Sequence, residues 1–194
     1  MENPAIYLAS RSPRRQELLG QIGVCYTLLD VEIDESVRPN ENPDDFGIRM
    51  AMEKAEAGAA QLQQQDKPIL AADTSVIVDN RILGKPDNEE DAIEMLTMLS
   101  ARSHRVLTAV ALTSSETSYR LSESQVQFRP IDIGEIRSYW ESGEPADKAG
   151  AYGIQGLGAI FVERISGSYS GVMGLPLFET AELLRNAGIR VLQD

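Results

Sequence analysis

Short apolar runs that are typical of β-strands alternate with helical patterns along part of this sequence. Such alternation predicts parallel strands, because a crossover helix carries the chain back between them. Two pairs of strand-like segments instead follow one another directly, and Asp79-Asn80 is a candidate two-residue turn within the first pair. A hairpin makes its two strands antiparallel. The sequence therefore predicts an α/β fold with a mixed sheet flanked by helices.

Apolar spacing and the residues that begin or end helices place the individual elements. Predicted strands span 6–8, 69–78, 81–83, 105–112, 119–128 and 159–162. Predicted helices run from 13 to 20–23, from 42–44 toward 62, from a cap at 87–88 through 99, over 133–141 and from 176 to 188. The segments 30–42, 153–158 and 166–171 are predicted loops. Since no repeat, low-complexity linker or domain boundary is visible, we expect one domain over 1–194.

Composition excludes several classes of protein. Lysine and arginine total 18 against 30 for aspartate and glutamate, which gives a net charge of −12. Proteins that coat DNA or RNA depend on neutralising phosphates, so this acidic excess argues against them and fits ordinary cytosolic solubility. The apolar runs are shorter than a bilayer requires, and the N-terminus lacks the pattern of a signal peptide. We therefore expect a cytoplasmic protein with no membrane partner.

The chain has one cysteine, Cys25, and one histidine, His104. These counts exclude an internal disulfide, histidine-based metal sites, Ser–His triads and Cys–His dyads. We expect Cys25 to be a small core or half-buried residue, and His104 to be structural or at the surface. Catalysis would then depend on Asp, Glu, Lys and Arg, with or without a metal bound by oxygen ligands.

The segment Leu8-Ala9-Ser10-Arg11-Ser12-Pro13-Arg14-Arg15 joins the first predicted strand to the first predicted helix. Ser12 is a candidate N-cap, and Pro13 suits the first helical position. Three arginines oppose the helix dipole here, because that end already carries partial positive charge. An anion held by backbone N–H groups, hydroxyls and guanidiniums would account for them. Three solvated arginines on a frayed first turn are the alternative, and spacing alone does not separate the two.

Asp73 interrupts the apolar strand 69–78. A carboxylate there costs free energy unless it is paired, binds a metal or opens onto a cleft. An aspartate at a strand edge, hydrogen-bonded to backbone, is the alternative, and we favour the functional interpretation. Lys54 borders the buried face of its helix, and Lys85 lies in the tight connection Gly84-Lys85-Pro86. Each lysine by itself is more typical of a solvated side chain than of a site.

The segment Gly153-Ile154-Gln155-Gly156-Leu157-Gly158 is too rich in glycine for a helix or a central strand. Such a backbone can approach a ligand closely, and Gln155 offers both a donor and an acceptor. A loop built only for turning is the alternative. The order of glycines does not match the dinucleotide-binding fingerprint, and no Walker A sequence is present. In combination, the basic helix start, Asp73, the two lysines, the acidic loop 30–42 and this loop favour phosphate chemistry with a divalent cation.

Six ordered blocks of the chain resemble the Maf family of nucleoside triphosphate pyrophosphatases. The blocks are 8–15, 53–55, 72–74, 84–86, 147–156 and 174–176. The resemblance implies an inosine-triphosphatase-like α/β fold, in which helices flank an elongated, twisted mixed sheet and two lobes form a cleft. It also implies a homodimer, and cleavage between the α and β phosphates of a nucleotide to give the monophosphate and pyrophosphate.

The resemblance assigns roles to individual residues. Asp73 would be the general base that accepts a proton from the attacking water, and with Glu35 it would bind a divalent cation, Mg²⁺ or Mn²⁺. Glu32 and Asp34 are less secure metal ligands, because one sequence does not fix the register of their loop. The residues implied to bind the triphosphate are Ser10, Arg15, Lys54 and Lys85. Those implied to set base preference are Arg14, Thr74 and Gln155.

Base preference has a physical explanation. Arg14, Thr74 and Gln155 match the branch that acts on dTTP and UTP, whereas the branch specific for 7-methylguanine nucleotides has Trp, Gln and Glu there. A thymine or uracil edge presents acceptor, donor and acceptor, which a glutamine amide partly matches. A guanine edge presents adjacent donors, which suit a carboxylate better. Because the wrong base leaves buried groups unpaired, such a site discriminates well. One departure is Arg11, which stands where a small residue is common.

We therefore expect a metal-dependent pyrophosphatase that acts on dTTP and UTP or on modified pyrimidine nucleotides. A broader pyrophosphatase of the inosine-triphosphate-cleansing type is the nearest rival within the same reaction. A regulatory nucleotide- or nucleic-acid-binding protein linked to cell division and septum formation is the alternative from another class. The acidic net charge weighs against nucleic acid as the partner.

Overall fold

The structure is a computed structural model that describes residues 4–191. Within that range the strands form one seven-stranded sheet in the order β2-β1-β3-β5-β6-β7, with β4 paired to β3. The described chain divides into two compact units. The first unit contains 4–73, 108–122 and 174–191, and the second contains 74–107 and 123–173. The predicted mixed sheet flanked by helices is confirmed, and the expected single domain over 1–194 stays a prediction.

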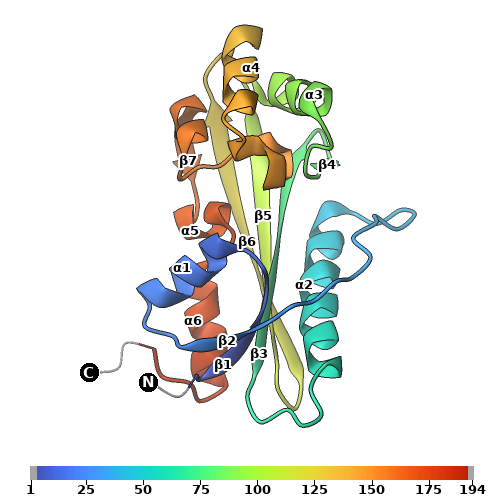
Figure 1. Ribbon diagram of the computed structural model, residues 1–194, viewed down its shortest axis with the longest axis vertical. Helices are drawn as coiled ribbons and strands as arrows, with labels where there is room; N and C mark the ends of the chain where they lie inside the picture. Colours follow the sequence, from blue (N-terminus) through green and yellow to red (C-terminus); the bar gives the residue numbers. More distant parts are fainter. Residues whose placement is uncertain (1–3, 192–194) are drawn as a thin grey trace. The chain divides into compact units, whose positions relative to one another are not determined.

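The first unit is built on parallel strands. Its elements are β1 (Ile6–Ala9), α1 (Pro13–Gln21), β2 (Tyr26–Leu29), α2 (Pro43–Ala60), the first half of β3 (Ile69–Val78) and α6 (Leu177–Asn186), together with parts of β5 (Ser103–Thr113) and β6 (Thr117–Phe128). β1 pairs in parallel with β2, where Ile6 faces Tyr26, and with β3, where Tyr7 faces Ile69. In Figure 1, α2 lies on one side of these strands, and α1 and α6 lie on the other.

Small side chains bring α2 close to the sheet. Ala51 and Ala55 of the helix are fully buried in a cluster that contains Ile69 and alanines of the strands, among them Ala9 and Ala71. Burial of such a surface stabilises the helix far more than its intrinsic propensity does. The same packing gives α2 a defined position on the first half of β3, which carries Asp73.

The second unit contains a two-residue hairpin and the 3₁₀ helices of the described chain. Its elements are the rest of β3 with parts of β5 and β6, β4 (Arg81–Leu83), α3 (Glu89–Leu99), α4 (Ile133–Glu141), β7 (Val162–Ser166), α5 (Tyr169–Met173) and three 3₁₀ helices, η1 (Glu144–Asp147), η2 (Ala149–Ala151) and η3 (Leu157–Phe161). α3 and α4 pack against each other (Figure 1). Pairs β3–β4 and β6–β7 are antiparallel.

Local signals in the second unit agree with the prediction. Asp79 and Asn80 have φ angles of 49° and 62°, which is the backbone that a two-residue hairpin turn requires. Asn88 caps α3 by accepting a hydrogen bond from the Asp91 amide. Asp132 and Glu135 form a reciprocal capping box at the start of α4. These short-range interactions explain why the helix bounds in this unit lie close to the predicted ones.

Three predictions are wrong. The segment 153–158 is not a loop throughout, because its last two residues belong to the 3₁₀ helix η3. The expected strand 159–162 is instead the 3₁₀ helix η3, and the strand begins only at Val162. An apolar run of four residues has no periodicity that separates the two states. The segment 166–171 is not a loop throughout, because α5 begins at Tyr169, where the Ser168 hydroxyl accepts a hydrogen bond from the Gly171 amide. Strand β2 was not predicted, and its residues are half-buried or exposed.

Cys25 is half-buried, as expected. None of the helices within residues 4–191 is long and apolar enough to cross a membrane.

Candidate active site

Lys54, Asp73 and Glu35 meet in the first unit. Lys54 lies on α2, and its Nζ is 2.7 Å from Oδ1 of Asp73 on β3 and 2.7 Å from Oε1 of Glu35 in the loop before α2. Asp73 is only 9% exposed. A carboxylate can stand in this apolar strand because the Lys54 ammonium pairs with it. The pairing offsets the free-energy cost of burying the charge. The sequence favoured a functional role for Asp73 over a strand-edge aspartate, and that role stays a prediction.

Arg15 and Ser10 belong to the same cluster of charges. Ser10 directly follows β1, and its Oγ lies 3.2 Å from Nη1 of Arg15, which donates to it. Arg15 Nε also donates to the Gly174 carbonyl oxygen at 2.7 Å. The loss of surrounding water lowers the pKa of Arg15, whereas the negative charges of Asp73 and Glu35 act in the opposite direction. All five side chains thus interact electrostatically or through hydrogen bonds within a single compact unit.

The beginning of α1 differs in detail from the expectation. The helix starts at Pro13, and Ser12 occupies the N-cap position, as predicted. The Ser12 side chain makes no capping hydrogen bond to the first turn, which also lacks an acidic residue. The Ser12 amide instead donates to Ser10 Oγ at 3.2 Å. Arg14 is half-buried in the first turn, and its charge further lowers the pKa of Arg15.

Arg11 does not lie in solvent without a partner. It forms ion pairs with Asp30 and, at 2.9 Å, with Glu32. All three side chains are exposed, so each pair contributes little to stability. The contact nevertheless engages Glu32. Asp34 is also engaged, because its Oδ1 accepts a hydrogen bond from the Ser36 amide at 2.9 Å. Glu35 is the acid of this loop that reaches Lys54, and its implied role as a metal ligand stays a prediction.

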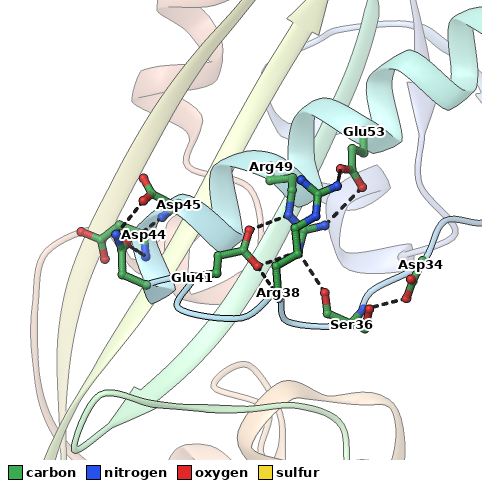
Figure 2. Close-up of polar contacts among 9 residues, drawn as sticks. Asp34, Ser36, Arg38, Glu41, Asp44, Asp45, Arg49 and Glu53 are labelled. Atoms are coloured by element: carbon green, nitrogen blue, oxygen red, sulfur yellow. Dashed lines mark hydrogen bonds and ion pairs between the residues drawn. The ribbon is translucent and has the colours of Figure 1, made fainter.

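An ion-pair network ties the loop before α2 to the helix itself. Figure 2 shows Arg49 of α2 between Glu41 and Glu53. Its Nε and Nη2 donate to the two carboxylate oxygens of Glu41 at 2.5 and 2.7 Å, and Nη2 also donates to the Ser36 carbonyl oxygen at 2.9 Å. Glu53 accepts from Nη1 of Arg49 at 3.3 Å and from Nη2 of Arg38 at 2.8 Å.

The Arg49–Glu41 pair of this network is largely shielded from water. The side chains of Arg49 and Glu41 are 12% and 9% exposed, and the hydrogen bonds from Arg49 are the main reason why the pKa of Glu41 falls to about 2. A bidentate arginine–carboxylate pair has a fixed geometry. Because Ser36 directly follows Glu35, the bond from Arg49 to the Ser36 carbonyl restrains the backbone next to the Lys54 partner.

Three further predicted site residues lie in the second unit. Thr74 continues β3 and is half-buried. Lys85 follows β4 and is exposed, and the neighbouring Gly84 carbonyl oxygen accepts a hydrogen bond from the Gly150 amide at 2.9 Å. Gln155 is exposed in the glycine-rich loop, which we define as residues 153–158. The implied roles of these residues stay predictions.

Two groups of residues with structural importance for the site were missed by sequence reasoning. Arg49 could have been noticed, since its spacing of four from Glu53 is that of a helical ion pair. Glu144 and Tyr139, which contact the glycine-rich loop, carry no such signal, because their partners in that loop lie 13 or 14 residues further along the chain.

Comparison with known proteins agrees with the geometry. The model of the family described as Maf-like protein matches residues 5–187. A protein of Alkalilimnicola ehrlichii named dTTP/UTP pyrophosphatase is 54% identical over 185 residues, which cover 93% of this chain and 92% of that protein. Proteins of the same name from Methylobacillus flagellatus and Cupriavidus metallidurans are 54% and 55% identical, with 96% and 95% of this chain and 94% and 97% of theirs covered.

Solved structures give weaker matches. The Ham1 protein of Staphylococcus aureus aligns with a TM-score of 0.42 at 17% identity, over 63% of this chain and 71% of that one. A nucleoside-triphosphatase, or dITP/XTP pyrophosphatase, of Mycobacterium abscessus aligns with a TM-score of 0.42 at 20% identity, over 94% of each chain. The family match extends over almost the whole sequence and includes every residue of the charged cluster. By this match, and by its identity to full-length relatives, the chain belongs to the Maf family.

Proposed function

We propose that this protein hydrolyses dTTP and UTP to the nucleoside monophosphate and pyrophosphate. The observation that carries the proposal is the cluster of Lys54, Asp73 and Glu35 beside Arg15. It combines a carboxylate that can accept a proton with cations that can neutralise phosphate. The substrate comes from the relatives, which are more than half identical over nearly their whole length and are named dTTP/UTP pyrophosphatases.

In this reaction a water oxygen forms a bond to the α phosphorus while the bond from that phosphorus to the bridging oxygen breaks. Pyrophosphate leaves with the bridging oxygen, and the proton of the attacking water passes to the carboxylate of Asp73. Arg15 and Lys54 bind the triphosphate and stabilise the negative charge that develops on its oxygens. Ser10, whose Oγ already contacts Arg15, can donate its hydroxyl hydrogen to a phosphate oxygen.

The donor set in the first unit also fits a divalent cation. Glu35 and Asp73 supply carboxylate oxygens that both lie within hydrogen-bond distance of one nitrogen. No cluster of three or more His, Cys, Asp or Glu arranged for a metal exists within the described part of the chain. Mg²⁺ often binds through one or two carboxylates and completes its shell with substrate phosphates and water. We propose that Glu35 and Asp73 hold Mg²⁺ or Mn²⁺, which when bound would withdraw charge from the phosphate oxygens.

The remaining proposals follow the family resemblance. Lys85 would bind the triphosphate, and Arg14, Thr74 and Gln155 would contact the base. A homodimer in the cytoplasm is the proposed working form. The net charge of −12 supports a free nucleotide, rather than nucleic acid, as the partner.

The test is to incubate the protein with single nucleoside triphosphates and Mg²⁺ or Mn²⁺, and to measure monophosphate and pyrophosphate. We expect dTTP and UTP to be hydrolysed in preference to the other nucleotides. The Asp73→Asn variant should lose a factor of roughly 10² to 10⁴ in kcat, because proton transfer contributes about that much. Asp66→Asn is the matched control, since Asp66 is an exposed residue of the same unit.

Comparable hydrolysis of all nucleoside triphosphates, or no hydrolysis of dTTP and UTP, would contradict the proposal. Full activity of Asp73→Asn would contradict the role of Asp73. A variant that binds nucleotide normally but does not hydrolyse it would support both.

A further inference from the structure

The Glu144 carboxylate is surrounded by hydrogen-bond donors of the glycine-rich loop. Its Oε1 accepts from the Tyr139 hydroxyl at 2.7 Å and from the Gly158 amide at 3.1 Å, and its Oε2 accepts from the Leu157 amide at 2.8 Å. The Tyr139 oxygen in turn accepts from the Gly153 amide at 3.0 Å. Two side chains from outside the loop thus bind three of its backbone N–H groups. Charge-assisted bonds of this kind are stronger than neutral ones.

These bonds lie on both sides of the turn that carries Gln155. The turn is closed by a hydrogen bond from the Gly156 amide to the Gly153 carbonyl oxygen at 3.4 Å. The Gly153 amide, held by Tyr139, precedes Gln155, and the Leu157 amide, held by Glu144, follows it. The backbone on either side of the Gln155 side chain is therefore anchored, although Gln155 itself is exposed.

The glycines are explained by the same contacts. A Cβ atom on Gly156 would lie 2.6 Å from Oε1 of Glu144, and one on Gly158 would lie 2.6 Å from the Tyr139 oxygen. Both distances are shorter than real contacts of Cβ atoms. The φ of Gly156 is −117°, which any residue adopts, so left-handed geometry is not the reason for glycine there. The loop needs glycine because it closes tightly around Glu144 and Tyr139.

The site also keeps Glu144 charged. Partial burial alone would raise the pKa of its carboxyl, but the hydrogen bonds from Tyr139 and from the Gly158 and Leu157 amides outweigh that effect, and the pKa is lowered. An ionised carboxylate accepts from all three donors at neutral pH.

We propose that Glu144 is a positioning residue for base recognition, whose carboxylate holds the turn that presents Gln155 and so sets the preference for pyrimidine over purine nucleotides. The proposal rests on the proposed function, in which the Gln155 amide contacts the edge of the base. A recognition group discriminates well only when its supporting structure is rigid, because a mobile amide can adjust to the wrong edge. Tyr139 supports the same turn through the Gly153 amide.

The first test is the Glu144→Gln variant, which keeps the shape of the side chain but replaces one acceptor oxygen with an NH₂ group. We expect the ratio of kcat/KM for dTTP to that for dGTP to fall about tenfold, mainly through a higher KM for dTTP, since a bond to a charged group is lost. Glu141→Gln is the matched control, because Glu141 is exposed at the end of α4, and its ratio should equal that of the unmodified protein. Tyr139→Phe should also lower the ratio, and it provides a second test of the same turn if Glu144→Gln folds poorly.

The second test asks whether Glu144 acts through Gln155. Gln155→Ala should lower the ratio, and adding Glu144→Gln to it should change the ratio no further. A purely structural role would reduce kcat for all nucleotides equally and leave the ratio unchanged, and that result would overturn the proposal. An equal drop in the ratio in both backgrounds would overturn it as well.

Hydrogen exchange without nucleotide separates this inference from the proposed function. The amides of Leu157 and Gly158 should exchange faster in Glu144→Gln than in the unmodified protein, and unchanged exchange would overturn the positioning role. If the unmodified protein shows no preference for dTTP and UTP, the proposed function fails by that result alone, before any variant is compared.

Discussion

His104 is the only histidine of the chain. It lies on β5, and only 3% of its surface is exposed. Its Nε2 lies 2.9 Å from the Tyr152 hydroxyl oxygen, and its ring packs edge-on against Phe128 with 4.8 Å between centroids. Its Nδ1 has no hydrogen-bond partner among residues 4–191. Burial lowers the pKa of His104 from 6.5 to about 4, because the charged imidazolium would lose its hydration. The residue is structural, which is one of the two roles the sequence allowed.

This pKa difference makes stability depend on pH. The unfolded chain binds a proton at His104 near pH 6.5, whereas the folded protein binds it only near pH 4. The contribution of neutral His104 to the free energy of unfolding is fully present above about pH 6.5, and it is lost as the pH falls toward about 4. At about 1.36 kcal/mol for each pKa unit, the full loss is about 3 kcal/mol, of which about 2 kcal/mol is lost between about pH 7 and about pH 5.

The assay is urea unfolding at about pH 7 and about pH 5 for the unmodified protein and for His104→Gln, whose amide does not titrate. The carboxylates are the same in both proteins, so their effect cancels in the comparison. The free energy of unfolding should fall by about 2 kcal/mol more in the unmodified protein than in the variant. Because the chain has one histidine, its Cε1 proton also gives a single NMR titration curve.

Either of two results would refute this reasoning. One is an NMR midpoint near the unperturbed value of 6.5 in the folded protein. The other is an equal loss of stability in both proteins over the same pH range.

Two further predictions concern the backbone and the loop before α2. Gly150 has a φ of +69°, and a Cβ there would lie 2.9 Å from Cγ1 of the buried Val76, so Gly150→Ala should lower the free energy of unfolding by roughly 2 kcal/mol or more, as measured in urea. Gly20→Ala is its control: nothing lies within 4 Å of that position on α1, and a gain of up to about 1 kcal/mol is expected. Arg49→Gln should loosen the loop that it holds, so that limited proteolysis cuts there sooner and kcat/KM falls roughly tenfold to a hundredfold through misplacement of a catalytic group. Arg81→Gln, at an exposed ion pair, is the control and should change neither the rate of proteolysis nor kcat/KM. If proteolysis of Arg49→Gln is no faster than that of the unmodified protein, the positioning role of Arg49 is contradicted.

Local chemistry explains which elements could be predicted. Asp79-Asn80, the cap at Asn88 and the capping box at Asp132 act over two to four residues, so their patterns are visible in a sequence. The strand β3 is a long apolar run and was recognised with its bounds. The short elements η3 and β2 were not recognised, because they have five and four residues and depend on what packs against them. The short strand β4 was recognised, because it follows the turn at Asp79-Asn80.

The candidate site shows the same division. Asp73 stands out by itself, as a charge in an apolar strand, and the order of short blocks along the chain identifies the family. In the sequence, only that resemblance marks Lys54 and Lys85 as site residues, because a lysine considered by itself cannot be distinguished from a solvated surface lysine.

The sequence by itself determined the fold class, the family and the residue types available for chemistry, because composition, periodicity and motif order are properties of the chain. Only the tertiary structure decided which acid of the loop before α2 reaches Lys54, since Glu32 and Asp34 have other partners. It alone placed the Glu144 carboxylate against the backbone amides of the glycine-rich loop. Contacts between residues distant along the chain depend on how elements pack, and a hydrogen bond tolerates only a few tenths of an ångström, which no local pattern specifies.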